Sequence, residues 1–381
     1  MTDFNLNKPF EMSIEENRRS FIKKMGGGAI ALPFLSNKGQ TQPSETYDGK
    51  KLGIALVGLG YYAVHKILPG IDESPYWELK GIVTGTPSKI PALKEKYNLK
   101  DENILNYDNY ANLSNCPDID VVYVCLPNGM HAEYSIKAAN AGKHVITEKP
   151  MANTVKECMD MIKACADNNV KLAVGYRCHF EPFNLELMRY GREKTFGKLN
   201  YIQSMFGWTA GDPKMWRLNK ELGGGGPLMD VGIYSINAAR YTKGMEPRSV
   251  VAHFGPVTDK ARFSEVEESV SWHMEFPDDT VFTGFTSYNT NVEKFQAYGD
   301  KGWVEMGPAF SYGPIVGNTS KGKMDMPVVY HQTYQMNGMG KLFLSSDPMP
   351  DHCSGVEGLK DMKIITAIYE SAEAGGKKIM L

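Results

Sequence analysis

Asp230 and Tyr234 are the two residues whose types and spacing most directly suggest chemistry. They lie four residues apart in the run GGGGPLMDVGIYSINAARY, residues 223–241, where four glycines allow a tight turn and Pro227 marks a helix start. One helical turn would put this carboxylate and this phenol on the same face, where they could hold a substrate hydroxyl and move its proton. The alternative is structural, with Asp230 complementing the helix dipole and Tyr234 packing at a domain edge.

A glycine motif near residue 60 predicts a dinucleotide site. The apolar stretch 51–57 is typical of a buried strand, and the pattern G-x-G-x-x-A follows it just before a predicted helix. Gly58 and Gly60 would let the main chain approach a pyrophosphate. The helix start at Tyr62 and Ala63 would supply N–H groups and a positive dipole. We therefore expect the first half of the chain to bind a nicotinamide dinucleotide at this turn.

The end of the next predicted strand, 77–83, indicates which dinucleotide is bound. Thr84, Ser88 and Lys89 stand where an NAD-binding chain would show an acid that bonds the ribose hydroxyls. Hydroxyls and an ammonium group suit the 2′-phosphate of NADP instead. The sequence therefore favours NADP over NAD as the cofactor.

Two further predicted strands, 120–126 and 144–147, should deliver side chains to one edge of the sheet, because open parallel sheets bind ligands at the carboxyl ends of their strands. The residues that follow these strands are Pro127, Asn128 and His131, then Glu148 and Lys149. Lys149 is expected where a nicotinamide ring would lie, and it could polarise a sugar oxygen. The structural alternative is a solvated loop lysine. His131 is expected to start a helix near the cofactor rather than to carry a proton.

The elements that position these residues fall into two groups. From residue 51 to 176, apolar strands alternate with helices, which predicts a doubly wound parallel sheet, a Rossmann domain. After a helix at 183–193, short strands alternate apolar and polar residues through tight turns, at 269–276, 280–288, 293–298 and 302–306. The expected fold class is therefore α/β, with an N-terminal Rossmann domain plus a C-terminal α+β domain that has a large open, mostly antiparallel sheet.

The second sheet is expected to be an antiparallel meander with one face on the helix of Asp230. The other face is expected to carry aromatic residues such as Trp272 and Phe282, or their neighbours. An open face of this kind suggests a subunit contact that forms a homodimer or homotetramer. Residues 307–350 are expected to be a long loop over the sheet, and residues 355–374 a closing amphipathic helix.

The first 38 residues have the layout of a twin-arginine export signal. Arg18, Arg19, Phe21 and Lys23 precede an uncharged, weakly apolar run that is too short to span a bilayer as a stable helix. We therefore expect export to the periplasm. The alternative is a basic tail with no targeting role. The predicted organisation is a signal at 1–38, a polar arm at 39–50, an NADP-binding Rossmann domain at 51–176 and a substrate and oligomerisation domain at 177–381.

Composition narrows the range of partners. The formal net charge of -2 on 381 residues gives no reason to expect nucleic acid or an anionic membrane as a partner. No segment reaches membrane length, so stable membrane insertion after export is not expected. The six cysteines form no C-x-x-C pair and no zinc-type spacing, so we expect no metal site. Small neutral ligands suit this chain best.

These motifs together resemble the Gfo/Idh/MocA family of oxidoreductases, in its glucose-fructose oxidoreductase branch. GLGYYA, LPNGMHAE, AGKHVITEKP, GYRCHFEP, MWRLNKEL and the glycine run occur in the family's order. The resemblance implies a catalytic cluster of Lys149, Asp230 and Tyr234. It also implies cofactor contacts at Gly58, Gly60, Thr84, Lys89, Asn128, Glu148, Arg177, Trp216 and Arg217. The remaining expected members of the cofactor site are Tyr62, Ala63, Pro127, His131 and Lys149.

The expected function is that of an exported NADP-dependent sugar oxidoreductase, which moves hydride between a sugar C1 or carbonyl carbon and a tightly held nicotinamide. Tyr234 would be the acid/base, Lys149 its electrostatic partner and Asp230 an anchor for a neighbouring hydroxyl. A sugar-to-sugar cycle with ping-pong kinetics is a further expectation. The alternatives are a glycoside-cleaving enzyme that oxidises its sugar transiently, a simple NADP-dependent aldose or diol dehydrogenase, and a cofactor-carrying protein without turnover.

Overall fold

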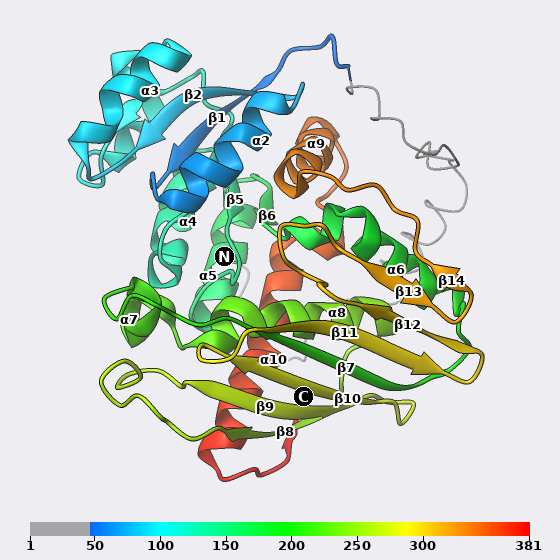
Figure 1. Cartoon of the computed structure of the whole chain (residues 1–381). Coiled ribbons are helices and arrows are strands. Elements are labelled where there is room, and N and C mark those ends of the chain that lie inside the picture. The colour runs from blue at the N-terminus through cyan, green and yellow to red at the C-terminus, as the bar shows by residue number, and fades with distance from the viewer. Residues whose placement is uncertain (1–45) are drawn as a thin grey trace, which may run out of the picture. The chain divides into compact units, whose positions relative to one another are not determined.

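The structure, a computed structural model, describes residues 46–381 (Figure 1). The predicted export signal at 1–38 and the first part of the polar arm lie outside the described residues. Residues Thr46–Leu381 form one compact unit that contains two sheets. The domain limit predicted at residue 176 falls between the last strand of the first sheet and the first strand of the second, and it stays a prediction.

The first sheet has six strands in the order β3-β2-β1-β4-β5-β6, and every neighbouring pair is parallel. The strands are β1 Leu52–Val57, β2 Trp77–Val83, β3 Ile104–Leu105, β4 Val121–Val124, β5 His144–Thr147 and β6 Leu172–Val174. β1 and β4 are apolar and almost wholly buried, as a parallel sheet covered on both faces requires. The strand order reverses between β1 and β4, the position at which doubly wound sheets bind ligands. The Rossmann part of the fold prediction is thereby confirmed.

Helices cover both faces of this sheet. The helices that follow its strands are α2 Leu68–Glu73, α3 Ile90–Tyr97, α4 His131–Asn140 and α5 Val155–Asp167. A further helix, α9 His331–Leu344, comes from a distant part of the chain and lies beside α2 (Figure 1). Trp77 Nε1 donates a hydrogen bond to the Met336 carbonyl at 2.7 Å, and Met336 is buried in the same core as Ile54 and Leu56. Helix α9 therefore belongs to the layer of helices that covers one face of the first sheet.

The expectation of a long loop at residues 307–350 is wrong. The segment contains α9 and two short strands, β13 Gly317–Thr319 and β14 Gly322–Lys323. The glycines in this segment weaken the helical pattern in the sequence, but they allow α9 to pack closely on the first sheet. A Cβ on Gly340 would lie 2.4 Å from the Tyr76 Cβ, so only glycine lets α9 approach the start of β2 this closely.

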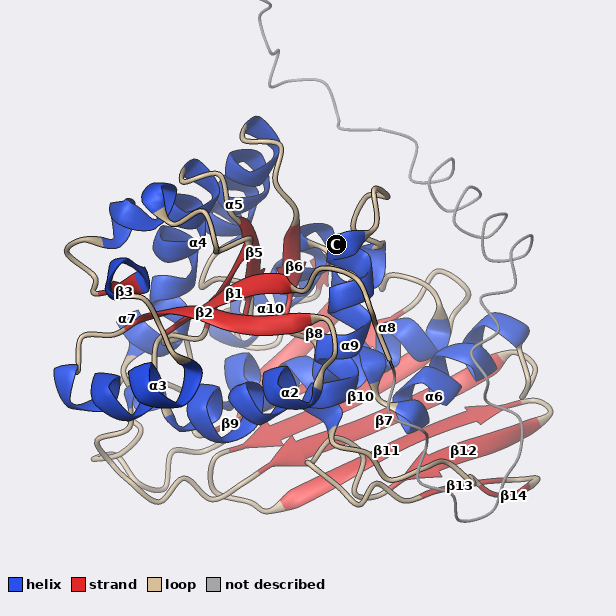
Figure 2. Ribbon diagram, turned by 90° about the horizontal axis from the view of Figure 1, so that it is seen from above, coloured by secondary structure: helices blue, strands red, loops and turns tan. Residues whose placement is uncertain are grey.

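The second sheet has nine strands in the order β14-β13-β12-β11-β7-β10-β9-β8-β15. The strands not yet named are β7 Leu199–Gly207, β8 Ser249–Phe254, β9 Ser269–Glu275, β10 Val281–Ser287, β11 Val292–Gly299, β12 Gly302–Met306 and β15 Ile379–Met380. Its pairs are antiparallel except for β7 and β10, which run parallel. The large, mostly antiparallel sheet of the fold prediction is therefore confirmed. Helices α6 Pro182–Glu193, α8 Ile233–Lys243 and α10 Gly355–Glu373 lie on one of its faces (Figure 2).

The predicted meander is wrong at its centre, because β10 and β11 do not pair with each other. Strand β7, which is not among the strands expected from the sequence, lies between them. Gly207 pairs with both Ser287 and Val292. The chain therefore crosses over the end of β7 in the short connection 288–291. A Cβ on Gly207 would lie 2.6 Å from the Thr290 carbonyl oxygen, so glycine at this position makes room for the crossing.

Trp272 and Phe282 lie on the helix-covered face of the sheet, so the expectation that they line the open face is wrong. Both side chains are fully buried, with ring centroids 5.9 Å apart, in the core that also holds Ile236 of α8. Gly284 pairs with Trp272 on the neighbouring strand, and a Cβ there would lie 2.3 Å from the indole ring. The missing side chain of Gly284 gives the indole its space.

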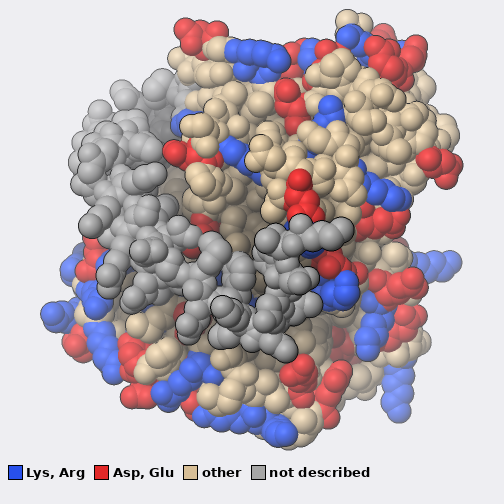
Figure 3. Space-filling model, turned by 180° about the vertical axis from the view of Figure 1, so that it is seen from behind, with Lys and Arg blue, Asp and Glu red and all other residues tan. Residues whose placement is uncertain are grey.

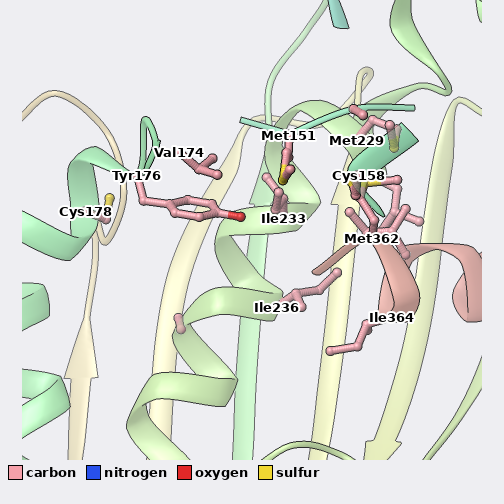
Figure 4. Close-up of a cluster of buried hydrophobic side chains, with 14 of the residues drawn as sticks. Met151, Cys158, Val174, Tyr176, Cys178, Met229, Ile233, Ile236, Met362 and Ile364 are labelled. Carbon is pink, nitrogen blue, oxygen red and sulfur yellow. The ribbon is translucent and has the colours of Figure 1, made fainter. Parts of the chain in front are cut away.

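The helix that carries Asp230 and Tyr234 is fixed by a core between the two sheets. Ile233 and Ile236 of α8 belong to the same cluster as Met151, which follows β5, and Met362 of α10 (Figure 4). Tyr176 belongs to the same cluster, and its hydroxyl donates a hydrogen bond to the buried Asp361 carboxylate at 2.5 Å. Elements from both sheets therefore hold the start of α8.

The surface shows interspersed charge. On the face drawn in Figure 3, Lys and Arg side chains alternate with Asp and Glu, in keeping with the net charge of -2. Within residues 46–381, no helix is long and apolar enough to cross a membrane, and no group of His, Cys, Asp and Glu side chains could hold a metal ion. All six cysteines have free thiols.

Candidate active site

Three segments converge at the carboxyl edge of the first sheet. Strand β5 ends at Thr147 and leads directly to Glu148 and Lys149, and the chain after β6 carries Arg177 to the same edge. The glycine turn at 223–226 and a turn of π-helix, Leu228–Gly232, bring Asp230 to meet them. Lys149 Nζ donates a hydrogen bond to the Asp230 main-chain oxygen at 2.6 Å and lies 3.5 Å from its Oδ1. The sequence-predicted pair of Lys149 and Asp230 is thus in direct contact.

Asp230 lies between two cations. Arg217 Nε is 3.2 Å from the same Oδ1 that faces Lys149, and the Asp230 side chain is 14% exposed. Burial by itself would raise the pKa of this carboxyl, but Arg217 and Lys149 outweigh burial and hold the pKa well below its ordinary value. Asp230 is therefore a carboxylate at neutral pH, with capacity to accept hydrogen bonds from a ligand.

Tyr234 lies one turn further along the helix, as the spacing predicts. Lys149 Nζ is 4.8 Å and the Arg177 guanidinium carbon 4.9 Å from the centroid of its ring. Phe206 and Phe310 enclose the ring, with centroid distances of 5.5 and 5.9 Å. Burial raises the pKa of this phenol above its ordinary value, and Arg177 acts against that rise. The ring is therefore held rigidly beside two positive charges.

Glu267 supports the start of this helix from another part of the chain. Its carboxylate accepts hydrogen bonds from the main-chain N–H groups of Gly226 and Leu228, at 2.9 and 3.1 Å, and from the Tyr369 hydroxyl at 3.0 Å. Burial raises the pKa of Glu267. A Cβ on Gly226 would lie 2.4 Å from the Glu267 main-chain oxygen, so the glycine turn and Glu267 fit each other closely. No local pattern in the sequence signals this role of Glu267.

The glycine turn at residue 58 has the shape that a dinucleotide needs. Gly58 has a φ of 85°, and a Cβ there would lie 2.5 Å from the Cys125 carbonyl oxygen, so the turn requires glycine. A Cβ on Gly60 would meet nothing within 4 Å, so this residue faces open space. The helix begins here with a hydrogen bond from Val64 N to the Gly60 oxygen at 3.1 Å, and Ala63 is buried beneath it. The residues present therefore fit a pyrophosphate at the helix start.

Thr84 and Lys89 lie beside this turn. Lys89 Nζ donates a hydrogen bond to the Leu59 carbonyl at 2.7 Å, which links the end of β2 to the glycine motif. The Thr84 hydroxyl oxygen accepts a hydrogen bond from Thr86 N at 3.1 Å. The described residues thus place a hydroxyl and an ammonium group next to the dinucleotide turn.

The other predicted cofactor residues differ in their surroundings. Asn128, which follows Pro127, donates from Nδ2 to the Gly223 carbonyl at 2.9 Å and so ties the loop after β4 to the glycine turn of Asp230. The Arg217 guanidinium carbon lies 4.5 Å from the centroid of the Trp216 ring.

Both ring nitrogens of His131 lie 2.9 Å from main-chain oxygens, those of Pro150 and Leu126. His131 begins α4 and is fully buried, and burial lowers its pKa, which suits a structural role.

Glu148 is buried in the same region, and Tyr62, which is partly exposed, lies near it. The Tyr123 hydroxyl donates a hydrogen bond to Glu148 Oε1 at 2.6 Å. The same hydroxyl oxygen accepts a hydrogen bond from Gln335 Nε2 of α9 at 2.8 Å. Burial raises the pKa of Glu148, and burial followed by the nearby Glu148 carboxylate raises the pKa of Tyr62. Helix α9 therefore reaches the candidate active site as well as the first sheet.

Both halves of the chain match known families. Residues 52–176 match an oxidoreductase family with an NAD-binding Rossmann fold, and residues 185–305 match the GFO/IDH/MocA C-terminal domain.

Individual proteins match the chain over most of its length. D-xylose 1-dehydrogenase (NADP(+)) of Haloarcula marismortui is 26% identical over 340 residues, which cover 86% of this chain and 93% of that protein. D-glucoside 3-dehydrogenase of Escherichia coli is 27% identical and covers 85% of this chain and 96% of that protein. The crystal structure of aldose-aldose oxidoreductase from Caulobacter crescentus, complexed with glycerol, is 38% identical with a TM-score of 0.83, and covers 87% of this chain and 100% of that one.

Proposed function

Since the chain belongs to the Gfo/Idh/MocA family of oxidoreductases, we propose that it is an NADP-dependent sugar oxidoreductase whose acid–base chemistry is carried by Lys149, Asp230 and Tyr234. The observation behind this proposal is the convergence of these three side chains at the carboxyl edge of a dinucleotide-binding sheet. Sugars are the substrate class that the names of the similar xylose, glucoside and aldose enzymes support.

Tyr234 is proposed to exchange the proton of the reacting hydroxyl. Lys149 Nζ lies over its ring, so this positive charge favours the phenolate when the phenol loses its proton. The Asp230 carboxylate, held between Lys149 and Arg217, accepts a hydrogen bond from a neighbouring sugar hydroxyl and so orients the ring. When bound, the nicotinamide supplies the hydride chemistry. The same three side chains serve sugar reduction, with the proton step reversed.

NADP is the proposed cofactor because of the groups beside the glycine turn. Thr84 and Lys89 offer a hydroxyl and a cation where a 2′-phosphate would need them, and no carboxylate stands at the end of β2 to repel that phosphate. The xylose dehydrogenase relative, which is named for NADP, supports the same choice.

A panel of aldoses, ketoses and glycosides, monitored near the absorbance band of reduced nicotinamide, tests the activity. At least one sugar should produce a change that Tyr234→Phe lowers about a hundredfold to ten-thousandfold, the scale for losing one positioned proton carrier, while nucleotide binding is kept. A Tyr234→Phe protein with near-normal turnover would remove Tyr234 from the mechanism. A panel with no response would support the cofactor-carrying protein without turnover.

We further infer a cycle in which one sugar is oxidised and a second is reduced at the same site without release of the nucleotide. Two observations support it, the arginine pair at 18 and 19, which suggests export, and the similarity to an aldose-aldose oxidoreductase. Outside the cytoplasm, no nucleotide pool would be available for exchange. Protein purified without added nucleotide should contain bound NADP, and donor and acceptor sugars together should give parallel double-reciprocal lines. Intersecting lines, or a need for added NADP, would favour a simple dehydrogenase.

A second candidate function is cleavage of a glycoside through transient oxidation of its sugar. The similar D-glucoside 3-dehydrogenase supports the oxidation step of this function. Release of the aglycone without net change in nicotinamide absorbance would select this function.

We propose that the face of the nine-stranded sheet that no helix of residues 46–381 covers joins subunits in a homodimer or homotetramer. Light scattering on the purified protein measures this directly, and a monomer at micromolar concentration would refute it.

A further inference from the structure

Arg177 is a buried cation that the acid–base mechanism above does not use. It follows β6 and is 3% exposed. Its guanidinium donates hydrogen bonds to the Phe310 carbonyl oxygen and, from Nη1, to His331 Nδ1 at 2.9 Å. Burial and the neighbouring Arg177 lower the pKa of His331 to about 3, so the imidazole is neutral and its Nδ1 can accept this bond.

The charge of Arg177 has no carboxylate in direct contact among the described residues, although it acts electrostatically on Glu148 and Glu181. Within residues 46–381 no carboxylate forms a salt bridge with it, and its Nε is buried without a hydrogen-bond acceptor. Burying a charge without a counter-ion is costly, so a fold that keeps such a charge is expected to use it. Two aromatic rings lie over the guanidinium: its Cζ is 4.9 Å from the Tyr234 centroid and 4.6 Å from the Tyr312 centroid.

Tyr234 therefore has two cations at nearly equal distance, Lys149 at 4.8 Å and Arg177 at 4.9 Å. A cation near the ring is attracted to it in either protonation state, but the attraction is larger when the phenol carries a negative charge. The other titratable groups that face Tyr234 are Glu148 after β5, Cys178 after β6, Asp230 on its own helix, Tyr62 after β1 and Tyr312 in the loop after β12. The two carboxylates among them oppose the phenolate, so the two cations are needed to favour it.

We propose that Arg177 is a positioning residue for the acid–base step, whose charge acts on Tyr234 as a second cation beside Lys149 and favours the ionised phenol. Phe310 and the neutral His331 hold the guanidinium in place without cancelling its charge. The inference rests on the proposed role of Tyr234. It differs from the role in cofactor contact that the family resemblance implies for Arg177, and experiment can separate the two.

The first test follows the ionisation of residue 234 directly. Difluorotyrosine placed at position 234, whose phenol is more acidic than that of tyrosine, reports its ionisation through its fluorine resonance as pH is raised. Arg177→Gln keeps a donor for the Phe310 carbonyl but loses the charge. It should raise the pH at which half of residue 234 is ionised, the midpoint, by about one pH unit. This is the lower end of the effect of a charge within 4–6 Å. Arg177→Lys should raise it less. An unchanged midpoint in Arg177→Gln overturns the proposal.

Lys66→Met is the matched control for loss of a nearby positive charge. Lys66 Nζ lies 4.7 Å from the centroid of Tyr312, not of Tyr234. This variant should leave the ionisation midpoint of residue 234 unchanged from that of the parent. A shift as large as that of Arg177→Gln would mean that the resonance reports the overall charge around the site, which also overturns the proposal.

A double-mutant cycle on kcat provides the second test. Arg177→Gln should lower kcat about tenfold in the parent, the factor that corresponds to one pKa unit, and less than twofold when Tyr234→Phe is already present. The dissociation constant of NADP should be unchanged. Equal losses in both backgrounds with weaker NADP binding would instead assign Arg177 to cofactor contact. If the parent turns over no sugar, the proposed function fails, and the fluorine titration alone still decides the role of Arg177.

Discussion

At the scale of single residues, the charge of Asp230 is expected to stabilise the fold. Its folded-state pKa lies below the unfolded value because of Arg217 and Lys149, so its contribution to stability is fully present above about pH 4 and is lost as pH falls below it. Asp230→Asn should therefore lower the free energy of unfolding at pH 7 by about 2 kcal/mol, since two partly buried cations lose their partner.

Thermal unfolding of the parent and of Asp230→Asn between pH 7 and pH 3 measures this effect. The difference in melting temperature should be largest at pH 7 and shrink as pH falls below 4, where Asp230 takes up a proton in the unfolded parent chain while the folded one stays ionised. A difference that is the same at both ends of this range would show that the charge of Asp230 does not stabilise the fold.

Thr84 gives the residue-scale test of cofactor choice. Thr84→Asp places a carboxylate at the end of β2, where it would bond the ribose hydroxyls of NAD and repel the 2′-phosphate of NADP. The ratio of the dissociation constants for the two nucleotides should move toward NAD by about a hundredfold or more, as expected for an unfavourable buried charge contact. Equal affinity of the parent protein for both nucleotides would contradict the NADP proposal.

The sequence predicts some residues of the candidate site and misses others for a physical reason. Lys149, Asp230 and Tyr234 follow strands or glycine turns, and such positions can be recognised from local patterns. Glu267 and His331 act on partners far away in the sequence, as when Glu267 binds the N–H of Gly226, and no local pattern signals such a contact. A carboxylate in an ordinary loop sequence carries no sign of what it will bind.

At the scale of elements, the strands with strong apolar patterns are predicted closely. The prediction for 77–83 coincides with β2, and that for 144–147 coincides with β5. The pairing of strands cannot be predicted in the same way, because it depends on contacts between segments that are distant in the sequence. Strand β7 occupies the centre of the second sheet although the strands on both of its sides come later in the chain. Its insertion could not be read from the short turn between β10 and β11.

The π-helical turn that carries Asp230 depends on Glu267, and this gives an element-scale prediction. Glu267→Ala leaves the N–H groups of Gly226 and Leu228 and the Tyr369 hydroxyl without their acceptor. The free energy of unfolding should fall by about 3 kcal/mol, since each buried donor left without a partner costs about 1 kcal/mol or more. Denaturant unfolding measures this change.

Glu265→Ala is a matched control on the same segment. Glu265 is exposed, and it accepts hydrogen bonds from Lys220 N and Asn219 Nδ2 at the surface. Its removal should cost less than about 1 kcal/mol, because water can replace the lost acceptor. If both variants lose the same stability, Glu267 has no special role in holding the helix start.

At the scale of the whole molecule, export is proposed to follow folding and cofactor loading, because a twin-arginine signal is typical of proteins that cross a membrane already folded. Arg18→Lys together with Arg19→Lys should leave the protein in the cytoplasm, with NADP bound and sugar turnover intact. Cell fractionation followed by immunoblotting checks the location. An unchanged distribution between cytoplasm and periplasm would mean that the arginine pair is not a signal.

The packing of α9 on the first sheet limits how this enzyme can be recombined with its relatives. Trp77 and Met336 are hydrogen-bonded although they lie 259 residues apart. A Cβ on Gly70 of α2 would come within 2.8 Å of the Gln332 backbone, so this contact tolerates no added atom. In a chimera that takes only residues 51–176 from a relative, α9 of this chain would have to pack on the relative's α2 and β2. A chimera made to change the cofactor preference therefore has to take two separate segments from the relative, residues 51–176 and residues 331–344.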